Sequence, residues 1–172
     1  MSTGARFTGA RALLVLTVVA LLVVAVAGWG FSMLTSPFPK KVDAPLCSPN
    51  EVHAGDHVFP SEVTVSVLNA SRREGLAGRT MTTLKDDDFA AGHSGNAPKG
   101  TKVGTAQIWT EDPNSPATKL VSAWLPSAKV VRKKIDEPGV VVVVGDSFGQ
   151  VGTGPKSITA ASDATICSPT LS

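Results

Sequence analysis

The longest hydrophobic stretch of the chain lies close to its N-terminus. Residues 12–34 read ALLVLTVVALLVVAVAGWGFSML and contain no charged residue. A helix of this length spans about 34 Å, and the hydrocarbon core of a bilayer is about 30 Å thick. The pattern therefore predicts one transmembrane anchor over residues 12–34, with residues 1–11 in the cytoplasm.

A cleaved secretory signal peptide is the alternative for this stretch. Arg6 and Arg11 would form its basic region, and residues 25–27 read Ala-Val-Ala, the form of a cleavage site. The hydrophobic run continues past this point to Leu34, whereas a cleaved signal usually turns polar before its cleavage site. We therefore favour an uncleaved, single-pass anchor over secretion after cleavage near Ala27.

Hydrophobic and polar positions become periodic only beyond a proline-rich segment. Residues 35–62 contain five prolines and scattered polar residues without a period, which predicts an extracytoplasmic linker. Alternation over residues 63–68 predicts a half-buried strand. Ser71 and Glu74 form an S-x-x-E capping box, which predicts a helix that opens at Ser71 and ends near Lys85.

Three further strands and a second helix complete the predicted domain. The strands are expected over residues 103–110, 128–135 and 140–144, and the helix from Ser115 to Pro126. Five consecutive valines over 140–144 indicate a strand buried on both faces, and basic residues place 128–135 at a sheet edge. Residues 89–102 are ambiguous between a short strand at Phe89 and a loop, and residues 150–172 predict an irregular tail.

Together these elements predict an α/β fold, in which a small mixed sheet of four to five strands carries two helices over residues 63–149. Charge supports this division of the chain. Four of the 16 lysines and arginines flank the hydrophobic stretch, which leaves 12 basic residues against 14 acidic residues beyond it. A nearly neutral domain argues against nucleic-acid binding, which requires a basic surface.

Two cysteines, Cys47 and Cys167, bracket this domain, and each stands in a Cys-Ser-Pro sequence. Such a pair is typical of a structural disulfide formed in an oxidising compartment, and two unrelated free thiols are the alternative. A disulfide that closes so long a loop contributes about 4–5 kcal/mol in the chain-entropy model. We therefore expect the cysteines to be paired, the tail to be closed by the bond, and the domain to be extracytoplasmic.

Two motifs suggest chemistry that their surroundings do not support. Residues 145–149 match the G-x-S-x-G pattern of a nucleophile elbow, which requires a helix directly after the serine and a histidine downstream. Glycine and proline follow instead, and no histidine comes after Ser147. His53 and His57 have a spacing that suits metal binding on a helix, but Gly55 between them indicates a loop. We therefore expect no catalytic residue, metal or cofactor.

Several short motifs occur in a specific order between residues 63 and 149. They are Leu68-Asn69-Ala70-Ser71, Gly75-Leu76-Ala77, Gly95-Asn96-Ala97 and the run of valines that ends in Gly145-Asp146-Ser147-Phe148. In this order they resemble the LytR C-terminal domain family. The chain departs from the family pattern after Phe89, where the family has a β-branched strand. A stand-alone, membrane-anchored copy of this domain is similar to the actinobacterial envelope integrity proteins of the Cei type.

The resemblance implies a non-catalytic, membrane-anchored module that supports cell envelope integrity by binding cell-wall polymer or an envelope partner protein. Asn69, Ser71 and Asn96 lie in the matched motifs and form the candidate binding surface. The alternative is an enzyme or enzyme subunit that acts on cell-wall glycan or its phosphate linkages. Such an enzyme would need paired carboxylates or a metal site, which the residue pattern does not supply. The sequence indicates neither the ligand nor the oligomeric state.

Overall fold

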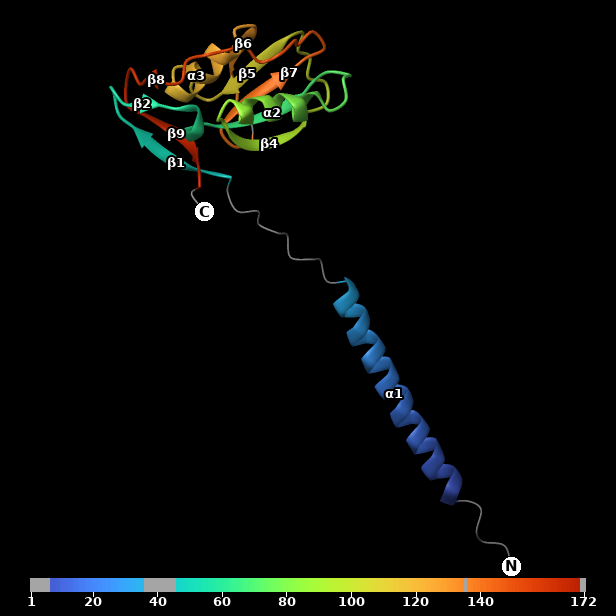
Figure 1. Ribbon diagram of the computed structural model, residues 1–172. Helices are drawn as coiled ribbons and strands as arrows, with labels where there is room; N and C mark the ends of the chain where they lie inside the picture. The colour runs from blue at the N-terminus through green and yellow to red at the C-terminus, as the bar shows by residue number, and fades with distance from the viewer. Residues whose placement is uncertain (1–6, 36–45, 135, 171–172) are drawn as a thin grey trace, which may run out of the picture. The chain divides into compact units, whose positions relative to one another are not determined.

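The N-terminal hydrophobic stretch forms one long helix, α1 (Phe7–Thr35), in the computed structural model, which describes residues 7–35, 46–134 and 136–170 (Figure 1). The chain divides into two compact units, Met1–Asp43 and Ala44–Ser172. No helix in the described ranges has the combined length and hydropathy that a membrane crossing requires. The transmembrane anchor therefore stays a prediction. Residues 1–6 of the predicted cytoplasmic segment and 36–45 of the predicted linker lie outside the described residues.

The second unit is built on a five-stranded mixed sheet with the order β4-β3-β7-β5-β6. Its strands are β3 (Thr64–Asn69), β4 (Ala90–Asn96), β5 (Ala106–Thr110), β6 (Ala128–Arg132) and β7 (Val140–Val144). β3 runs parallel to β4 and β7, β5 runs parallel to β6, and β5 and β7 are antiparallel. The predicted α/β fold with a small mixed sheet is confirmed, and β6 lies at an edge as expected.

The valines of β7 are buried on both faces of the sheet, as the sequence predicts. Val140, Val142 and Val144 belong to a core that they share with the helices α2 (Leu76–Asp86) and α3 (Pro116–Trp124). Val141 and Val143 pack on the opposite face with residues that include Leu68, Val103 and Trp109. Both helices therefore contribute to the core on one face, and the other face has a second, smaller core.

The two helices begin differently. α3 starts as predicted, because Ser115 Oγ accepts a hydrogen bond from Thr118 N at 3.1 Å and Pro116 stands at the first helical position. The capping box predicted for the first helix is wrong. α2 begins at Leu76, after Gly75 in the left-handed conformation (φ +68°), without a side-chain cap. A hydrogen-bonded turn around Asn69 and Ser71 forms just before α2. This turn competes with the helix for the same backbone groups, so the helix does not begin at Ser71.

The ambiguous segment after Phe89 is a strand, β4, which lies parallel to β3 at an edge of the sheet. Its residues are small or polar for a steric reason. A Cβ atom at Gly92 would lie 2.4 Å from Ser66 Oγ and 3.1 Å from the carbonyl oxygen of Val65. The departure from the β-branched family pattern therefore accompanies a close approach of β4 to β3.

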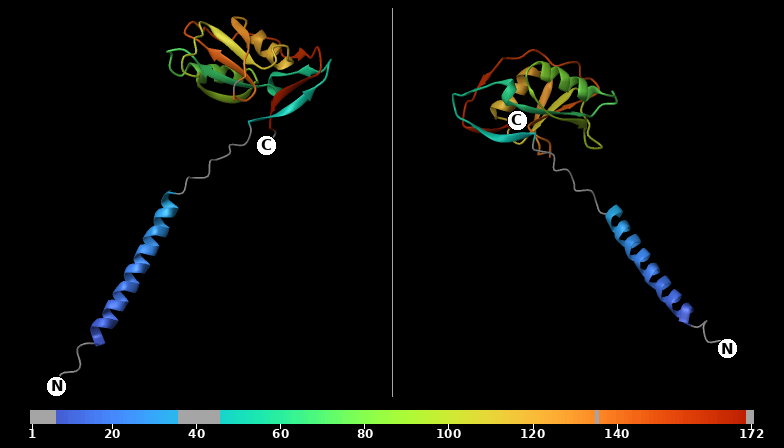
Figure 2. Two further views of the ribbon diagram at one scale, coloured as in Figure 1. Left: turned by 180° about the vertical axis from the view of Figure 1, so that it is seen from behind. Right: turned by 60° about the horizontal axis from the view of Figure 1, so that its bottom comes forward.

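The predictions of an unstructured linker over 35–62 and an irregular tail over 150–172 are wrong where the structure describes these segments. β1 (Cys47–Val52) pairs antiparallel with β9 (Ala164–Pro169), and β2 (His57–Val58) pairs with β8 (Ile158–Thr159). A short 3₁₀ helix, η1 (Pro60–Glu62), precedes β3. Figure 2 shows β1 and β9 side by side in both views. Val58 and Ile166 are almost fully buried in the main core, so both segments belong to the domain.

The predicted disulfide between Cys47 and Cys167 is confirmed, with 5.4 Å between the Cα atoms. In the β1–β9 ladder, Cys47 faces Pro169 and Cys167 faces Pro49, so the two cysteines are diagonal neighbours. The bond closes a loop with a sequence separation of 120 residues. It therefore joins the first strand of the domain to the last.

Candidate functional site

The predicted binding residues lie at the edge of the sheet where β3 and β4 end. Asn69 and Asn96 are partners in the register of these parallel strands. Asn69 is also paired with Val144 at the end of β7, which runs in the same direction. In open α/β sheets, ligands bind beyond the carboxyl ends of the strands. The structure therefore brings Asn69 and Asn96 together.

The side chains of Asn69 and Ser71 build the turn that follows β3. Asn69 Oδ1 accepts hydrogen bonds from Ser71 N at 2.9 Å and from Ser71 Oγ at 2.7 Å, and Asn69 Nδ2 donates to the carbonyl oxygen of Arg73 at 2.8 Å. Ser71 Oγ also accepts a bond from Arg73 N at 3.0 Å. These contacts give both side chains a structural role, and their role in binding stays a prediction.

The G-x-S-x-G motif forms the turn that ends β7. Ser147 N donates to the carbonyl oxygen of Gly104, and Phe148 N donates to that of Gly145. Asp146 Oδ1 accepts a bond from Arg72 N at 2.9 Å, which ties this turn to the one after β3. Irregular backbone follows the turn rather than a helix. The motif therefore lacks the strand–turn–helix setting of a nucleophile elbow.

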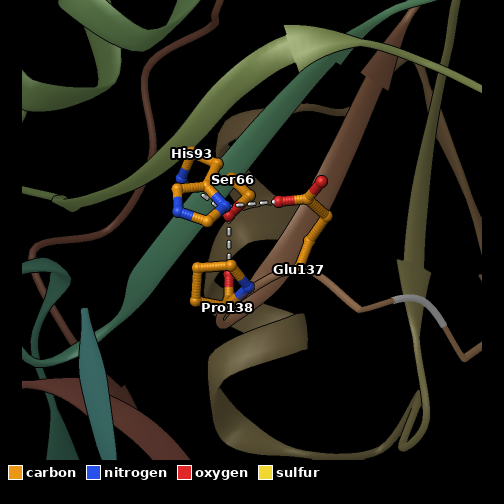
Figure 3. A network of polar contacts seen from close by, with 4 residues as sticks. All are labelled: Ser66, His93, Glu137 and Pro138. Atoms are coloured by element: carbon orange, nitrogen blue, oxygen red, sulfur yellow. Dashed lines mark hydrogen bonds and ion pairs between the residues drawn. The ribbon is translucent and has the colours of Figure 1, made fainter. Parts of the chain in front are cut away.

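A second serine lies close to a histidine and a glutamate, as Figure 3 shows for Ser66, His93 and Glu137. Ser66 Oγ donates to the carbonyl oxygen of Pro138 at 2.7 Å and accepts a bond from the backbone nitrogen of His93 at 3.0 Å. The His93 ring bonds Glu137 through Nδ1 at 2.8 Å. A catalytic serine needs its hydroxyl on the imidazole of the base. Here the buried hydroxyl bonds only backbone groups, so the cluster fastens β4 and the start of β7 to β3.

His93 is also far from the serine of the G-x-S-x-G motif. Its partner Glu137 stands before β7 begins, whereas Ser147 stands after β7 ends. Five strand residues separate the two ends by about 16 Å. His93 therefore cannot serve Ser147 as a base in this arrangement.

His53 and His57 lie at the β1–β2 connection, on exposed positions. Asp56 Oδ2 accepts a bond from His53 N at 2.8 Å, and the same carboxylate stands 3.7 Å from His53 Nδ1. In the described part of the chain, no group of three or more histidine, cysteine, aspartate or glutamate side chains has the geometry of a metal site.

A pocket of about 430 Å³ lies at the opposite end of the sheet. It opens where β3 and β7 begin and β5 ends, and α3 and β9 complete its wall. Its lining includes Thr64, Trp109, Glu111, Asp112, Lys133 and Glu137. The pocket therefore combines hydroxyl, carboxylate, ammonium and indole groups.

Two contacts organise the charged groups around the pocket. Lys133 Nζ lies 3.5 Å from the ring centroid of the buried Trp109, in a cation–π contact. Lys134 Nζ lies 3.4 Å from Glu111 Oε1 on the surface. Two basic side chains from the segment after β6 therefore interact with groups on and next to β5.

These pocket residues were not predicted from the sequence. Glu111 and Asp112 directly follow a strand, which is the signal for side chains at a sheet edge. The sequence pattern does not indicate that β5 is antiparallel to β7. That orientation brings the end of β5 to the beginnings of β3 and β7.

The mixed sheet and its two helices define a small α/β domain. The bond between Cys47 and Cys167 joins its first strand to its last. A family model described as LytR cell envelope-related transcriptional attenuator matches residues 62–148, about half of the chain. The chain belongs to this family.

Two further comparisons complete the picture. The crystal structure of the soluble domain of a conserved hypothetical secreted protein from Mycobacterium marinum is similar to the chain, with 26% sequence identity and a TM-score of 0.48. The likeness covers 59% of this chain and 78% of that one. A search of the curated proteins found no significant match.

Proposed function

We propose that this chain is a membrane-anchored, extracytoplasmic module that supports the cell envelope by binding wall material or an envelope partner protein, without catalysing a reaction. The disulfide between Cys47 and Cys167 carries the proposal, because such bonds persist in oxidising compartments outside the cytoplasm. Membership in a cell envelope-related family supports the same location.

The charge-free sequence of residues 12–34 supports the anchor, and the alternative is secretion after cleavage near Ala27. Arg6 and Arg11 before the hydrophobic stretch are matched by Lys40 and Lys41 after it, so the N-terminal amine gives the small excess of positive charge that favours an N-terminus in the cytoplasm. N-terminal sequencing of the protein recovered from membranes and from the culture medium distinguishes the two. A mature chain that starts shortly after Ala27 would contradict the anchor.

The contacts of the serine and histidine side chains argue against nucleophilic catalysis by Ser66 or Ser147. The Ser66 hydroxyl is bonded to backbone groups, and Ser147 lies about one strand length from the His93–Glu137 pair. Neither serine has the base that nucleophilic catalysis requires.

Sedimentation with purified wall and capture of partners from solubilised membranes test the proposal together. We expect the full chain to sediment with wall or to retain an envelope protein, with added wall as competitor to separate the two. Turnover of wall fragments that disappears after a single side-chain change would support the enzyme alternative instead.

A further inference from the structure

β6 is an open edge of the five-stranded sheet. It stands at the end of the strand order, where β5 is its neighbour. The backbone N–H of Lys133 donates inward to the carbonyl oxygen of Thr110 at 2.9 Å. Backbone groups of successive strand residues point to opposite sides, so those of Val130 and Arg132 point away from β5. Among the described residues, no backbone group outside β5 bonds residues 129–132, so this edge offers donors and acceptors to a further strand.

The two edges of the sheet differ in regularity. β5 and β6 pair over five consecutive residues without a register shift, whereas the β3–β4 ladder at the other edge is irregular between Val65 and Val67. Bulges and prolines are two means by which proteins block the pairing of edge strands. β6, with the sequence AKVVR, has neither. Of the two edges, β6 is therefore the better suited to accept a further strand.

The side chains of β6 select the strand that it can accept. Lys129 and Arg132 are exposed, and neither takes part in an ion pair with another described residue. Their partners in the β5–β6 register are the uncharged Gln107 and Thr110. Between the two cations, Val130 is 39% exposed. A strand that lies along this edge therefore meets two accessible cations and one apolar side chain.

The basic residues that follow β6 are excluded from this count. Lys133 already lies over the ring of Trp109, and Lys134 is paired with Glu111. Lys129 and Arg132 thus remain as the cations that a partner can pair without displacing an existing contact.

The same two charges disfavour a second copy of the chain as the partner. If two β6 strands paired antiparallel about their centres, Lys129 of each strand would face Arg132 of the other. In a parallel pair in register, each cation would face its own copy. Like charges directly opposite each other destabilise a sheet. The partner is therefore expected to be acidic.

The backbone of the edge distinguishes a peptide from a polymer of phosphate groups. Such a polymer could match the cations, but it has no N–H donors for the outward carbonyl groups of β6. An extended peptide supplies donors and acceptors along its whole length, in the spacing of a neighbouring strand. It therefore matches both the backbone and the charges of the edge.

We propose that the edge of β6 binds an extended acidic segment of an envelope protein, which adds to the sheet as a further strand. The proposal rests on the function proposed above and assigns its partner class and its docking surface. Main-chain hydrogen bonds form along residues 128–132. Two carboxylates three residues apart lie opposite Lys129 and Arg132, and a β-branched side chain lies opposite Val130.

Three synthetic peptides with blocked ends are the probes. The acidic peptide is Thr-Glu-Thr-Val-Glu-Thr, and the other two carry glutamine or lysine in place of both glutamates. NMR titration of the full, ¹⁵N-labelled chain in detergent reports which backbone amides shift and gives the affinity. We expect the acidic peptide to shift the signals of residues 128–133. It should bind at least about threefold more tightly than the glutamine peptide, and the lysine peptide should bind most weakly.

Charge reversal tests the two cations. The double variant Lys129→Glu/Arg132→Glu should reverse the preference, so that the lysine peptide binds more tightly than the acidic peptide. Lys99→Glu/Lys102→Glu is the matched control, because these two exposed lysines have the same spacing and lie in the loop after β4. The control should keep the preference of the unaltered chain.

A proline tests the backbone of the edge. Val130→Pro removes an N–H that points away from β5, and edge strands tolerate proline at such positions. It should weaken binding of the acidic peptide by at least about tenfold, whereas Val130→Thr, which keeps the N–H, should bind within about threefold of the unaltered chain. The amide spectrum of each variant without peptide verifies its fold. If the proline variant does not fold, the charge reversal decides the test.

Three results would overturn the edge site: no shift along residues 128–133 with the acidic peptide, equal binding of the three peptides, or equal binding by folded Val130→Pro and the unaltered chain. Shifts along β6 with sodium polyphosphate but not with the acidic peptide would also overturn it, and would indicate an anionic polymer as the ligand.

Capture of partners from solubilised membranes, measured in parallel, separates this failure from that of the proposed function. If the unaltered chain and Lys129→Glu/Arg132→Glu retain the same envelope protein equally, the partner binds elsewhere and the edge site is wrong. If the unaltered chain neither retains an envelope protein nor sediments with wall, the proposed function fails whatever the peptides do.

Discussion

Gly139 and Thr64 lie so close that a Cβ atom at residue 139 would stand 1.9 Å from the carbonyl oxygen of Thr64. Gly139 also has a φ of +72°, a conformation that side chains disfavour. Both requirements come from the same turn, which brings the chain back to start β7 between β3 and β5. Thr64 and Gly139 both line the pocket of about 430 Å³.

Replacing Gly139 with alanine should therefore destabilise the domain by about 2–4 kcal/mol, from backbone strain plus the clash with Thr64. Urea unfolding followed by circular dichroism measures the change. Gly100→Ala is the matched control, because Gly100 has a φ of +86° but no neighbour within 4 Å of a Cβ atom. The control should lose only about 1 kcal/mol. Equal losses would contradict the steric account.

Thr64→Val should stabilise the domain by about 1–2 kcal/mol, because it removes a buried hydroxyl that has no partner among the described residues. The valine preserves the shape and suits a strand. Differential scanning calorimetry of the ligand-free chain measures the effect. A loss of stability would mean that a buried water molecule already bonds this hydroxyl.

Cys47→Ser and Cys167→Ser should lower stability alike, by about 4–5 kcal/mol, since each change opens the same long loop. The double variant should add little to either single change. Denaturant unfolding gives the three values, and mass spectrometry of unreduced peptides detects the bond. Free thiols at both positions in protein isolated from the envelope would contradict the pairing.

Ser66→Ala should destabilise the domain by about 1–3 kcal/mol, because it leaves the carbonyl group of Pro138 and the backbone N–H of His93 without their partner. His93→Gln removes the surface hydrogen bond between the imidazole and Glu137 and should cost less than about 1 kcal/mol. The ranking of the two variants in urea unfolding checks the structural role of Ser66. The opposite ranking would mean that the imidazole, and not the serine, fastens β4.

The strands and helix with strong local signals were predictable from the sequence. Val140–Val144 form the central strand, and Ser115 with Pro116 starts α3, because burial pattern and capping act over a few neighbouring residues. The start of α2 was not predictable in this way. Two local hydrogen-bonding patterns compete for Ser71, and the turn with Asn69 prevails over the helix cap.

Long-range pairing explains the remaining misses. β1 and β9 are short and contain prolines, so neither has an alternating pattern, and each is a strand because the other lies beside it. The pocket depends on the same kind of information. Glu111 and Glu137 are separated along the chain and come to one site only through the antiparallel arrangement of β5 and β7. Asn69 and Asn96 were chosen as candidates from the family resemblance, the register of β3 and β4 brings them together, and their binding role stays a prediction.

The bond between Cys47 and Cys167 closes residues 47–167 into a covalent ring. A protease that cuts any one exposed loop between these cysteines would open the ring without releasing a fragment. The nicked protein would keep its mass on a non-reducing gel and separate into two pieces only after reduction. One such cut would leave every segment between the two cysteines attached to the N-terminal part of the chain.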